Sequence, residues 1–288
     1  MKYSELVKQG QSKLFKSGVS DAATDAWILM ESICNISKTD YFLKMHDEVS
    51  QENVDKYFAA INKRLTHYPL QYILGEWQFM GLNFKVNESV LIPRQDTEVL
   101  VIKVLNILEE EYKKDKKQVK ILDMCTGSGC IGISLAKLYP RSRIIAVDKS
   151  EEALAVAKEN ARINNIENIE FISSDLFENL TINEGEERFD IIVSNPPYIS
   201  SKEIETLMPE VKDFEPRMAL DGDEDGLIFY RRIVQDSKPF IKSKGFLVFE
   251  IGCTQAEDVK ELMRTRYENL EVIEDLAGLD RVVSGRRK

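Results

Sequence analysis

The chain has 288 residues, 43% of them hydrophobic, so it is long enough for one large domain with a substantial core and one smaller domain. Its formal charge of −10 disfavours non-specific binding to nucleic acid, because Lys and Arg supply most of that affinity. The four cysteines show no Cys-x-x-Cys spacing and only two histidines accompany them, so we expect no disulfide framework and no metal site. Without a secretory leader or an apolar run of about 18 residues, the chain is expected to be cytoplasmic and not to span a membrane.

Residues 1–70 are predicted to form a small helical domain, because apolar residues recur there at helical spacing among charged ones. Asp21 and Ser50 stand where they would cap two of these helices. Residues 71–95 are interpreted as a β-hairpin and linker, since apolar and polar residues alternate on both sides of Met80-Gly81. Asp96 or Thr97 is the expected N-cap of the apolar helix that follows.

Residues 96–288 alternate between short β-branched runs and helical patterns. We expect strands at 119–124, 143–147, 169–172, 189–194 and 245–251, separated by helices at about 130–139, 151–164 and 226–242. A last pair of strands, 270–275 and 281–284, has no helix between its members, which indicates an antiparallel end to the sheet. The predicted fold class is therefore α/β, a doubly wound, mostly parallel, seven-stranded sheet.

Asn195, Pro196, Pro197 and Tyr198 follow the apolar strand 189–194 directly. Proline ends the strand and stiffens the turn, Asn195 brings an amide with one acceptor oxygen, and Tyr198 brings a flat ring. This set suits a planar group that carries an NH2: the Asn195 oxygen and a proline carbonyl accept its protons while the ring stacks on its plane. We therefore predict catalytic roles for Asn195, Pro196 and Tyr198, and substrate contacts for all four residues.

A glycine-rich turn follows the strand 119–124, with Gly127, Gly129 and Gly132 in a Gly-x-Gly-x-x-Gly pattern. The pattern alone is also compatible with a dinucleotide. Asp123 favours a different ligand, because a carboxylate beside the turn repels a pyrophosphate and attracts an ammonium. S-adenosylmethionine carries an ammonium and a sulfonium and no phosphate. We predict that it contacts Asp123 and the turn residues Cys125, Thr126, Gly127, Ser128 and Gly129.

The next two strands also end in acidic residues. Asp148 is expected to accept both ribose hydroxyls, and Asp175 to accept the adenine amino group beside the apolar Leu176. Each acidic residue alone is more often a turn or cap residue. Four successive strand ends with this chemistry, including Asn195, favour one ligand site, because ligands of open α/β sheets bind outside the carboxyl ends of the strands.

With these residues in hand, the chain resembles the class I methyltransferases that modify the glutamine of peptide chain release factors, the PrmC or HemK family. The resemblance extends over nearly the whole length and includes 69–75, 81–82, 91–98, the glycine turn, 195–198, 215–227 and 249–252. Gln95 stands where a proline is usual, and Cys125 where glycine is more common.

The resemblance implies a Rossmann-like methyltransferase domain at 96–288 and methyl transfer from S-adenosyl-L-methionine to the glutamine N5 of a Gly-Gly-Gln motif, with S-adenosyl-L-homocysteine as product. It implies release factors as protein substrates, held by residues 1–70 and the hairpin. We expect a monomer that does not act on nucleic acid directly.

Three other interpretations remain open at this stage. An N6-adenine or N4-cytosine methyltransferase would use the same four residues, but would need a basic face or a target-recognition domain. A ribosomal-protein glutamine methyltransferase would differ chiefly in its N-terminal region. A non-catalytic adaptor would bind the donor without transferring the methyl group.

Overall fold

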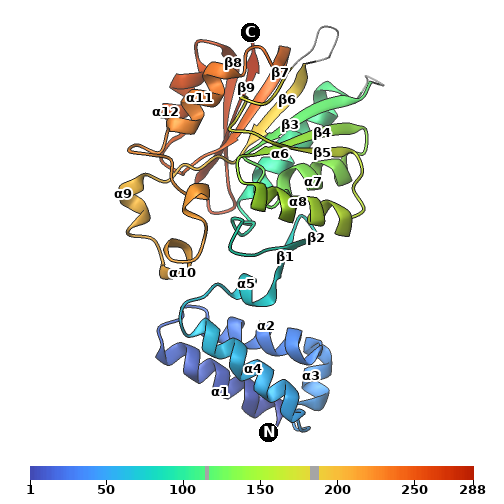
Figure 1. Cartoon of the computed structure of the whole chain (residues 1–288), viewed down its shortest axis with the longest axis vertical. Coiled ribbons are helices and arrows are strands. Elements are labelled where there is room, and N and C mark those ends of the chain that lie inside the picture. Colours follow the sequence, from blue (N-terminus) through green and yellow to red (C-terminus); the bar gives the residue numbers. More distant parts are fainter. Residues whose placement is uncertain (114–116, 182–187) are drawn as a thin grey trace. The chain divides into compact units, whose positions relative to one another are not determined.

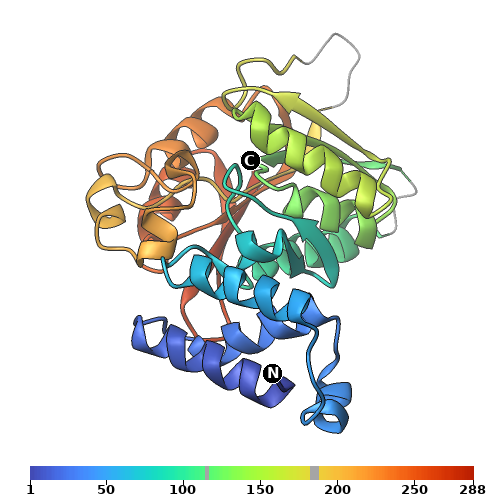
Figure 2. The same cartoon turned by 60° about the horizontal axis from the view of Figure 1, so that its bottom comes forward.

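The structure is a computed structural model that describes residues 1–113, 117–181 and 188–288. It divides into two units, one formed by residues 1–76 with 208–214 and the other by 77–207 with 215–288. The first unit is helical (Figures 1 and 2) and contains α1 (Tyr3–Lys16), α2 (Ala22–Cys34), α3 (Lys38–Lys44), α4 (Gln51–Arg64), α5 (Leu70–Leu74) and α10 (Pro209–Lys212).

Helices α1, α2 and α4 pack against one another around a fully buried apolar core that includes Leu6, Leu29 and Ile61. The predicted cap of α4 is confirmed, since the Ser50 hydroxyl accepts a hydrogen bond from the Asn53 amide at 3.3 Å. Asp21 is the N-cap residue of α2, but its side chain makes no capping hydrogen bond.

A buried ion pair joins the segment 208–214 to these helices. The Arg64 guanidinium at the end of α4 lies 2.6 Å from the Asp25 carboxylate and 3.1 Å from that of Glu210. Asp25 and Arg64 are both nearly inaccessible to solvent, so each requires the other's charge. A ring contact between Tyr68 and Phe214, 5.2 Å between centroids, adds to this junction.

The second unit is built on one seven-stranded sheet with the order β5-β4-β3-β6-β7-β9-β8. The first five strands pair in parallel, and β9 pairs antiparallel with both β7 and β8. This confirms the predicted fold class and its antiparallel end. The strands are β3 (Val119–Met124), β4 (Ser142–Asp148), β5 (Ile169–Ser173), β6 (Phe189–Ser194), β7 (Ile241–Glu250), β8 (Tyr267–Glu274) and β9 (Asp280–Arg287).

Helices cover both faces of this sheet (Figure 1). On one face, α6 (Thr97–Glu111), α7 (Cys130–Leu138) and α8 (Glu151–Ile163) pack on side chains such as Ile121 and Val193. On the other, α11 (Ile228–Asp236) and α12 (Ala256–Met263) pack on the alternate side chains, such as Leu122 and Ile192. This alternation explains the continuous apolar runs of the strands, which are buried on both faces.

The predicted hairpin is also present, as β1 (Glu76–Phe79) and β2 (Leu82–Lys85). Its turn places Met80 and Gly81 at positive φ, 49° and 73°, as the two central residues of the tightest hairpin turns require. Phe79 and Phe84 are buried in the same apolar cluster as α6 and α7, and the Lys85 amide donates to the Asn160 side chain of α8 at 2.7 Å.

The sequence-based prediction was wrong about one long helix and missed several short ones. The helix expected at 226–242 ends at Asp236, because Pro239 prevents its continuation, and β7 begins at Ile241. Helix α12, the four-residue α9 (Ser201–Ile204), α10 and a 3-10 turn (Arg217–Ala219) were not predicted. Among the residues that the structure describes, no helix is long and apolar enough to cross a membrane.

Gly10 gives a test of the packing in the first unit. A β-carbon there would lie 2.0 Å from the phenol oxygen of the fully buried Tyr57. We expect Gly10→Ala to lower the free energy of unfolding by about 1–3 kcal/mol through overpacking, although alanine favours a helix over glycine by about 1 kcal/mol. Urea denaturation measures the change, with the neighbouring exposed Gln11→Ala as control. Equal or greater stability of Gly10→Ala would contradict this packing.

Candidate active site

The register of the central strands brings four residues to one level at the carboxyl edge of the sheet. Met124 of β3 pairs with Val147 of β4 and with Ser194 of β6, and Ser194 pairs with Phe249 of β7. The residues that come next are Cys125 and Asn195, which directly follow β3 and β6, and Asp148 and Glu250, which end β4 and β7. The sheet order reverses direction between β3 and β6, which is the position where open α/β sheets bind ligands.

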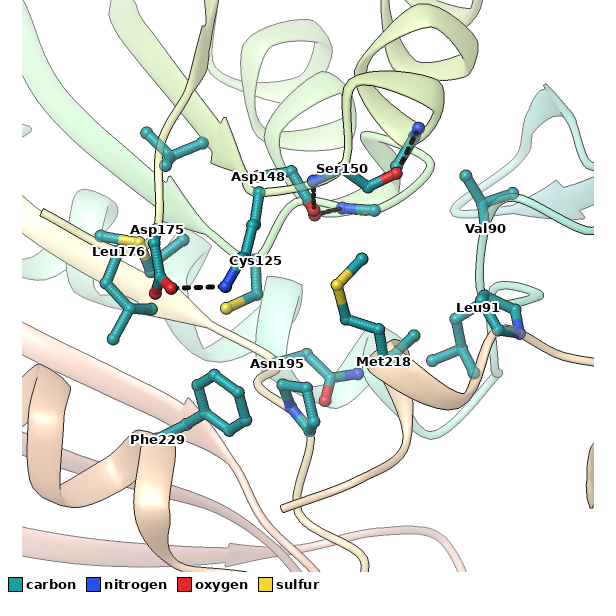
Figure 3. A pocket seen from close by; sticks show the side chains of 18 of the residues that line it. Val90, Leu91, Cys125, Asp148, Ser150, Asp175, Leu176, Asn195, Met218 and Phe229 are labelled. Atoms are coloured by element: carbon teal, nitrogen blue, oxygen red, sulfur yellow. Dashed lines mark hydrogen bonds and ion pairs between the residues drawn. The ribbon is translucent and has the colours of Figure 1, made fainter. Parts of the chain in front are cut away.

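A cavity of about 180 Å³ opens at this edge. Figure 3 shows Asp148 and Ser150 on one side of it and Asn195, Met218 and Phe229 on the other. The cavity brings together seven of the residues that the sequence singled out: Cys125, Gly127, Asp148, Asp175, Leu176, Asn195 and Pro197. Six others are not part of its lining: Asp123, Thr126, Ser128, Gly129, Pro196 and Tyr198.

The glycine-rich turn has a left-handed backbone at Cys125, Gly127 and Gly129, with φ of 61°, 55° and 82°. A side chain at Gly129 is excluded, because a β-carbon there would lie 2.8 Å from Ile133 and 3.1 Å from Ala157. Cys125 adopts a conformation that glycine favours, so the departure from the family pattern keeps the turn at the expense of some backbone strain. Burial raises the pKa of the Cys125 thiol, which therefore lines the cavity as a neutral group.

Asp123 is enclosed behind the turn and does not reach the cavity. One of its oxygens accepts hydrogen bonds from the Thr126 hydroxyl at 2.5 Å and from the Gly132 amide at 2.9 Å, and the other is buried without a partner among the described residues. Burial raises the pKa of Asp123 to about 7. The carboxyl thus fixes the turn against α7, and its direct contact with a ligand ammonium stays a prediction.

Asp148 combines a role in the turn with access to the cavity. Its two oxygens accept hydrogen bonds from the Gly127 amide at 2.8 Å and the Ser150 amide at 3.0 Å (Figure 3). Burial raises the pKa of this carboxyl, and the backbone N–H groups act in the opposite direction. Because each carboxylate oxygen has two lone pairs, both retain one for a ligand hydroxyl.

Asp175 lies on the cavity wall with both oxygens in contact with cations, Lys149 at 2.7 Å and Arg232 at 2.8 Å. The hydrogen bond from Lys149, more than the contact with Arg232, lowers the pKa of Asp175, so the group is ionised. Leu176 and Phe229 give this part of the cavity an apolar surface that suits a flat ring (Figure 3).

The Asn-Pro-Pro-Tyr turn presents only part of itself to the cavity. Asn195 and Pro197 line it, and the Asn195 side-chain N–H donates to the Thr97 hydroxyl at 3.3 Å. The Tyr198 hydroxyl donates to a Glu250 oxygen at 3.4 Å, and burial raises the pKa of this phenol, so it is a neutral donor. The Ser194 hydroxyl fixes the base of the turn by donating to the Met124 carbonyl at 2.7 Å.

Sequence reasoning missed several cavity residues that come from outside the strand ends. Val90 and Leu91 precede α6, Met218 lies in the 3-10 turn, and Phe229 and Arg232 lie on α11. The resemblance had included 91–98 and 215–227 as segments, but no spacing in them indicated which side chains would face the site.

Arg94 and Glu98, which belong to the segment 91–98, have separate partners. Arg94 forms an ion pair with the buried Glu215, which also accepts a hydrogen bond from the Ile92 amide. Glu98 accepts a hydrogen bond from the Met80 amide of the hairpin at 2.7 Å. Both residues therefore hold loops around α6. Within the described ranges, no group of three or more His, Cys, Asp or Glu residues is arranged to hold a metal ion.

Comparison with known proteins gives two family models and several close relatives. Residues 5–75 match the PrmC N-terminal domain and residues 103–211 the methyltransferase small domain. The chain is 40% identical over 276 residues to a release factor glutamine methyltransferase of Fusobacterium nucleatum, covering 95% of this chain and 76% of that protein. It is 38% identical over 286 residues to one of Clostridium acetobutylicum, covering 98% of each.

A solved structure of the hMettl16 catalytic domain in complex with MAT2A 3'UTR hairpin 1 is similar to this one with a TM-score of 0.56. It covers 90% of this chain and 88% of that one at 14% identity, which shows a shared fold alone.

Asp123 gives a test of the site's electrostatics. Its pKa is about 7 in the folded protein and near 3.8 when unperturbed, so the folded state keeps a proton that the unfolded state loses between these values. Its contribution to the free energy of unfolding therefore falls as pH rises from about 4 to 7. Asparagine keeps an acceptor for Thr126 and Gly132 and cannot titrate.

We expect the stability of Asp123→Asn, relative to the wild type, to improve from pH 5 to pH 7 and then to level off. Urea denaturation of both proteins at a series of pH values measures this difference. A difference that is the same at pH 5 and pH 8 would mean that Asp123 titrates normally.

Proposed function

The chain belongs to the family of release factor glutamine methyltransferases, and from this premise we propose how its site carries out the reaction. The enzyme transfers a methyl group from S-adenosyl-L-methionine to the side-chain amide nitrogen, N5, of the glutamine in the Gly-Gly-Gln motif of peptide chain release factors. The single observation that carries the proposal is the position of Asn195, an amide at the rim of a cavity whose other walls suit a nucleoside.

The donor set of the cavity fits S-adenosylmethionine better than a dinucleotide. A dinucleotide needs the backbone N–H groups of the glycine turn for its pyrophosphate. Here the Gly127 and Gly132 amides donate to the carboxylates of Asp148 and Asp123 instead. The Asp148 carboxylate, which lines the cavity at that position, disfavours a phosphate by charge. The spaced glycines thus form a tight turn whose backbone is held by acidic side chains and does not bind a phosphate.

We assign Asp148 to the ribose hydroxyls, and Leu176 and Phe229 to the faces of the adenine ring. Asp175 is the acceptor for the adenine amino group, and its ion pairs with Lys149 and Arg232 keep it ionised. Cys125 and Gly127 bring backbone close to the ligand. When bound, S-adenosylmethionine supplies a methyl group on a positively charged sulfur.

The reacting nitrogen belongs to an amide, which is a poor nucleophile because its lone pair is delocalised into the carbonyl. The Asn195 side-chain oxygen and the Pro196 backbone carbonyl accept its two protons and turn the lone pair toward the methyl group. Both acceptors also stabilise the positive charge that develops on nitrogen. Holding the reactants in this arrangement can lower the activation free energy by about 7–11 kcal/mol.

The remaining residues of the turn restrict the substrate. Pro197 stiffens the backbone and lines the cavity, and Tyr198 packs on the amide plane. The Tyr198 carbonyl accepts a hydrogen bond from the Gln255 side chain at 3.0 Å, which holds the turn in place. No strong general base is needed, because the methylated nitrogen is acidic enough to lose its proton to water.

We assign recognition of the protein substrate to residues 1–70 and to the hairpin in 71–95. The match of residues 5–75 to the PrmC N-terminal domain supports this assignment. A monomeric state, a cytoplasmic location and the lack of a nucleic-acid substrate stay predictions.

The activity itself is tested with labelled donor and purified release factor. We expect one methyl group per release factor, located by tandem mass spectrometry on the glutamine of Gly-Gly-Gln, and none when that glutamine is replaced. Transfer that persists without the glutamine would mean that another residue of the release factor is the target. Donor binding with no transfer would favour the adaptor interpretation.

Asn195→Ala tests the grip on the amide. We expect turnover to fall at least about 100-fold, since an acceptor that acts in the transition state is lost. Donor affinity, measured by calorimetry with S-adenosylhomocysteine, should stay within a few-fold. Asn106→Ala, an exposed substitution on α6, serves as the control. Near-normal turnover of Asn195→Ala would refute the role of its amide.

Asp148→Asn tests the donor contacts in the same assay. We expect donor affinity to fall by about tenfold or more, because an asparagine has a single acceptor oxygen where the carboxylate has two. Turnover at saturating donor should change less than affinity. An unchanged donor affinity would place the ribose elsewhere.

A further inference from the structure

Glu250 is a buried carboxyl group that takes no part in the proposed methyl transfer. It is the last residue of β7 and lies at the same height on the edge of the sheet as Asn195. Its exposed fraction is 2%. One oxygen accepts the hydrogen bond from the Tyr198 hydroxyl, and the other has no hydrogen-bond partner among the described residues. Burial raises the pKa of Glu250 to about 7. Such a group costs stability, so its presence behind the Asn-Pro-Pro-Tyr turn calls for another explanation.

The first residue of α6, Thr97, connects Glu250 to Asn195. Thr97 is 2% exposed, and its hydroxyl lies near enough to the Glu250 carboxyl group to lower the pKa of that group. The same hydroxyl accepts the hydrogen bond from the Asn195 side-chain N–H. Within the described part of the chain, this is the one hydrogen bond that the Asn195 side chain makes.

The direction of these hydrogen bonds decides which atom Asn195 offers to the substrate. When Glu250 is ionised, its charge attracts the proton of the Thr97 hydroxyl, which leaves the lone pairs of that hydroxyl for the Asn195 N–H. Those lone pairs accept only from the nitrogen side of the carboxamide. The Asn195 oxygen must then face away from Thr97.

We propose that Thr97 and Glu250 are positioning residues that hold the Asn195 carboxamide with its oxygen toward the substrate amide. This inference rests on the proposed function and adds two residues to it. A carboxamide is nearly symmetric in shape, and a half-turn would place an N–H donor where an acceptor is needed. Two N–H groups would then face each other, and the substrate amide would lose the partner that orients its lone pair.

Glu250 fixes more than one residue of the turn. Its hydrogen bond with Tyr198 restrains the ring of that residue directly, and its charge acts on Asn195 only through Thr97. Arg281 of β9, which is ion-paired with Asp275 at 2.9 Å, lies close enough to stabilise the charge on Glu250.

The test compares Thr97→Val with Thr97→Ser. Valine keeps the volume of threonine without the hydroxyl, and serine keeps the hydroxyl without the methyl group. We expect Thr97→Val to lower kcat for methylation of the release factor by about 10- to 100-fold, the loss typical of a misplaced reacting group. Donor affinity should stay within about twofold, and Thr97→Ser should restore most of the lost activity. Thermal melting of each variant measures the effect on folding.

A double substitution separates positioning from general damage. If Thr97 acts only through Asn195, then Thr97→Val should cause no further loss in the Asn195→Ala background, because the two residues act as one unit. Losses that multiply, or a kcat of Thr97→Val equal to that of the wild type, would overturn the inference.

Glu250→Gln provides a second variant if Thr97→Val does not fold. A glutamine amide can donate to Thr97 and so removes the fixed direction of the hydrogen bonds. We expect kcat to fall severalfold with unchanged donor affinity, and wild-type kcat would overturn the inference. A wild-type enzyme without activity on any release factor would instead contradict the proposed function, so the two failures are distinguishable.

Discussion

The pairing of β3 with β4 on one side and with β6 on the other is the constraint on which the rest of the site depends. It sets Met124, Val147 and Ser194 in one row, so that the residues after them emerge at the same height on the edge of the sheet. A shift of one residue in either pairing would turn the alternate side chains to the opposite face. The hydrogen bond between the Ser194 hydroxyl and the Met124 carbonyl strengthens this register where it is needed.

Acidic side chains at this edge accept hydrogen bonds from the backbone of the glycine turn, in addition to any contact with a ligand. Asp123 and Asp148 accept the amides of Gly132 and Gly127, which leaves the glycine turn with no free donors at those two positions for a phosphate. Asp148, which also lines the cavity, makes the edge negative, as suits a donor that carries positive charge. The glycine spacing therefore does not decide whether the site binds a dinucleotide or a sulfonium ligand. The preference is set by the acidic side chains that accept hydrogen bonds from the backbone N–H groups of the turn.

Much of this could be predicted from the sequence, because the signals are local. The strand at 189–194 is an unbroken apolar run that ends in two prolines, and it was placed correctly to the residue. Asp148 ends β4, Asp175 lies two residues beyond the end of β5, and both line the cavity. The burial of Asp123 could not be predicted, since it depends on how α7 packs over the turn. The same holds for Thr97 and Glu250, which are distant in sequence and meet only because α6 lies over the carboxyl end of β7.

The central claim is that Asn195 presents an acceptor oxygen to a glutamine amide beside a sulfonium methyl group. A crystal structure of the protein with S-adenosylhomocysteine and a Gly-Gly-Gln peptide tests it most directly. We predict that the Asn195 side-chain oxygen and the Pro196 carbonyl lie within hydrogen-bonding distance of the glutamine nitrogen, with Thr97 bound to the other side of the Asn195 carboxamide. A complex in which Asn195 points away from the glutamine, or in which the peptide binds elsewhere on the protein, would contradict the account.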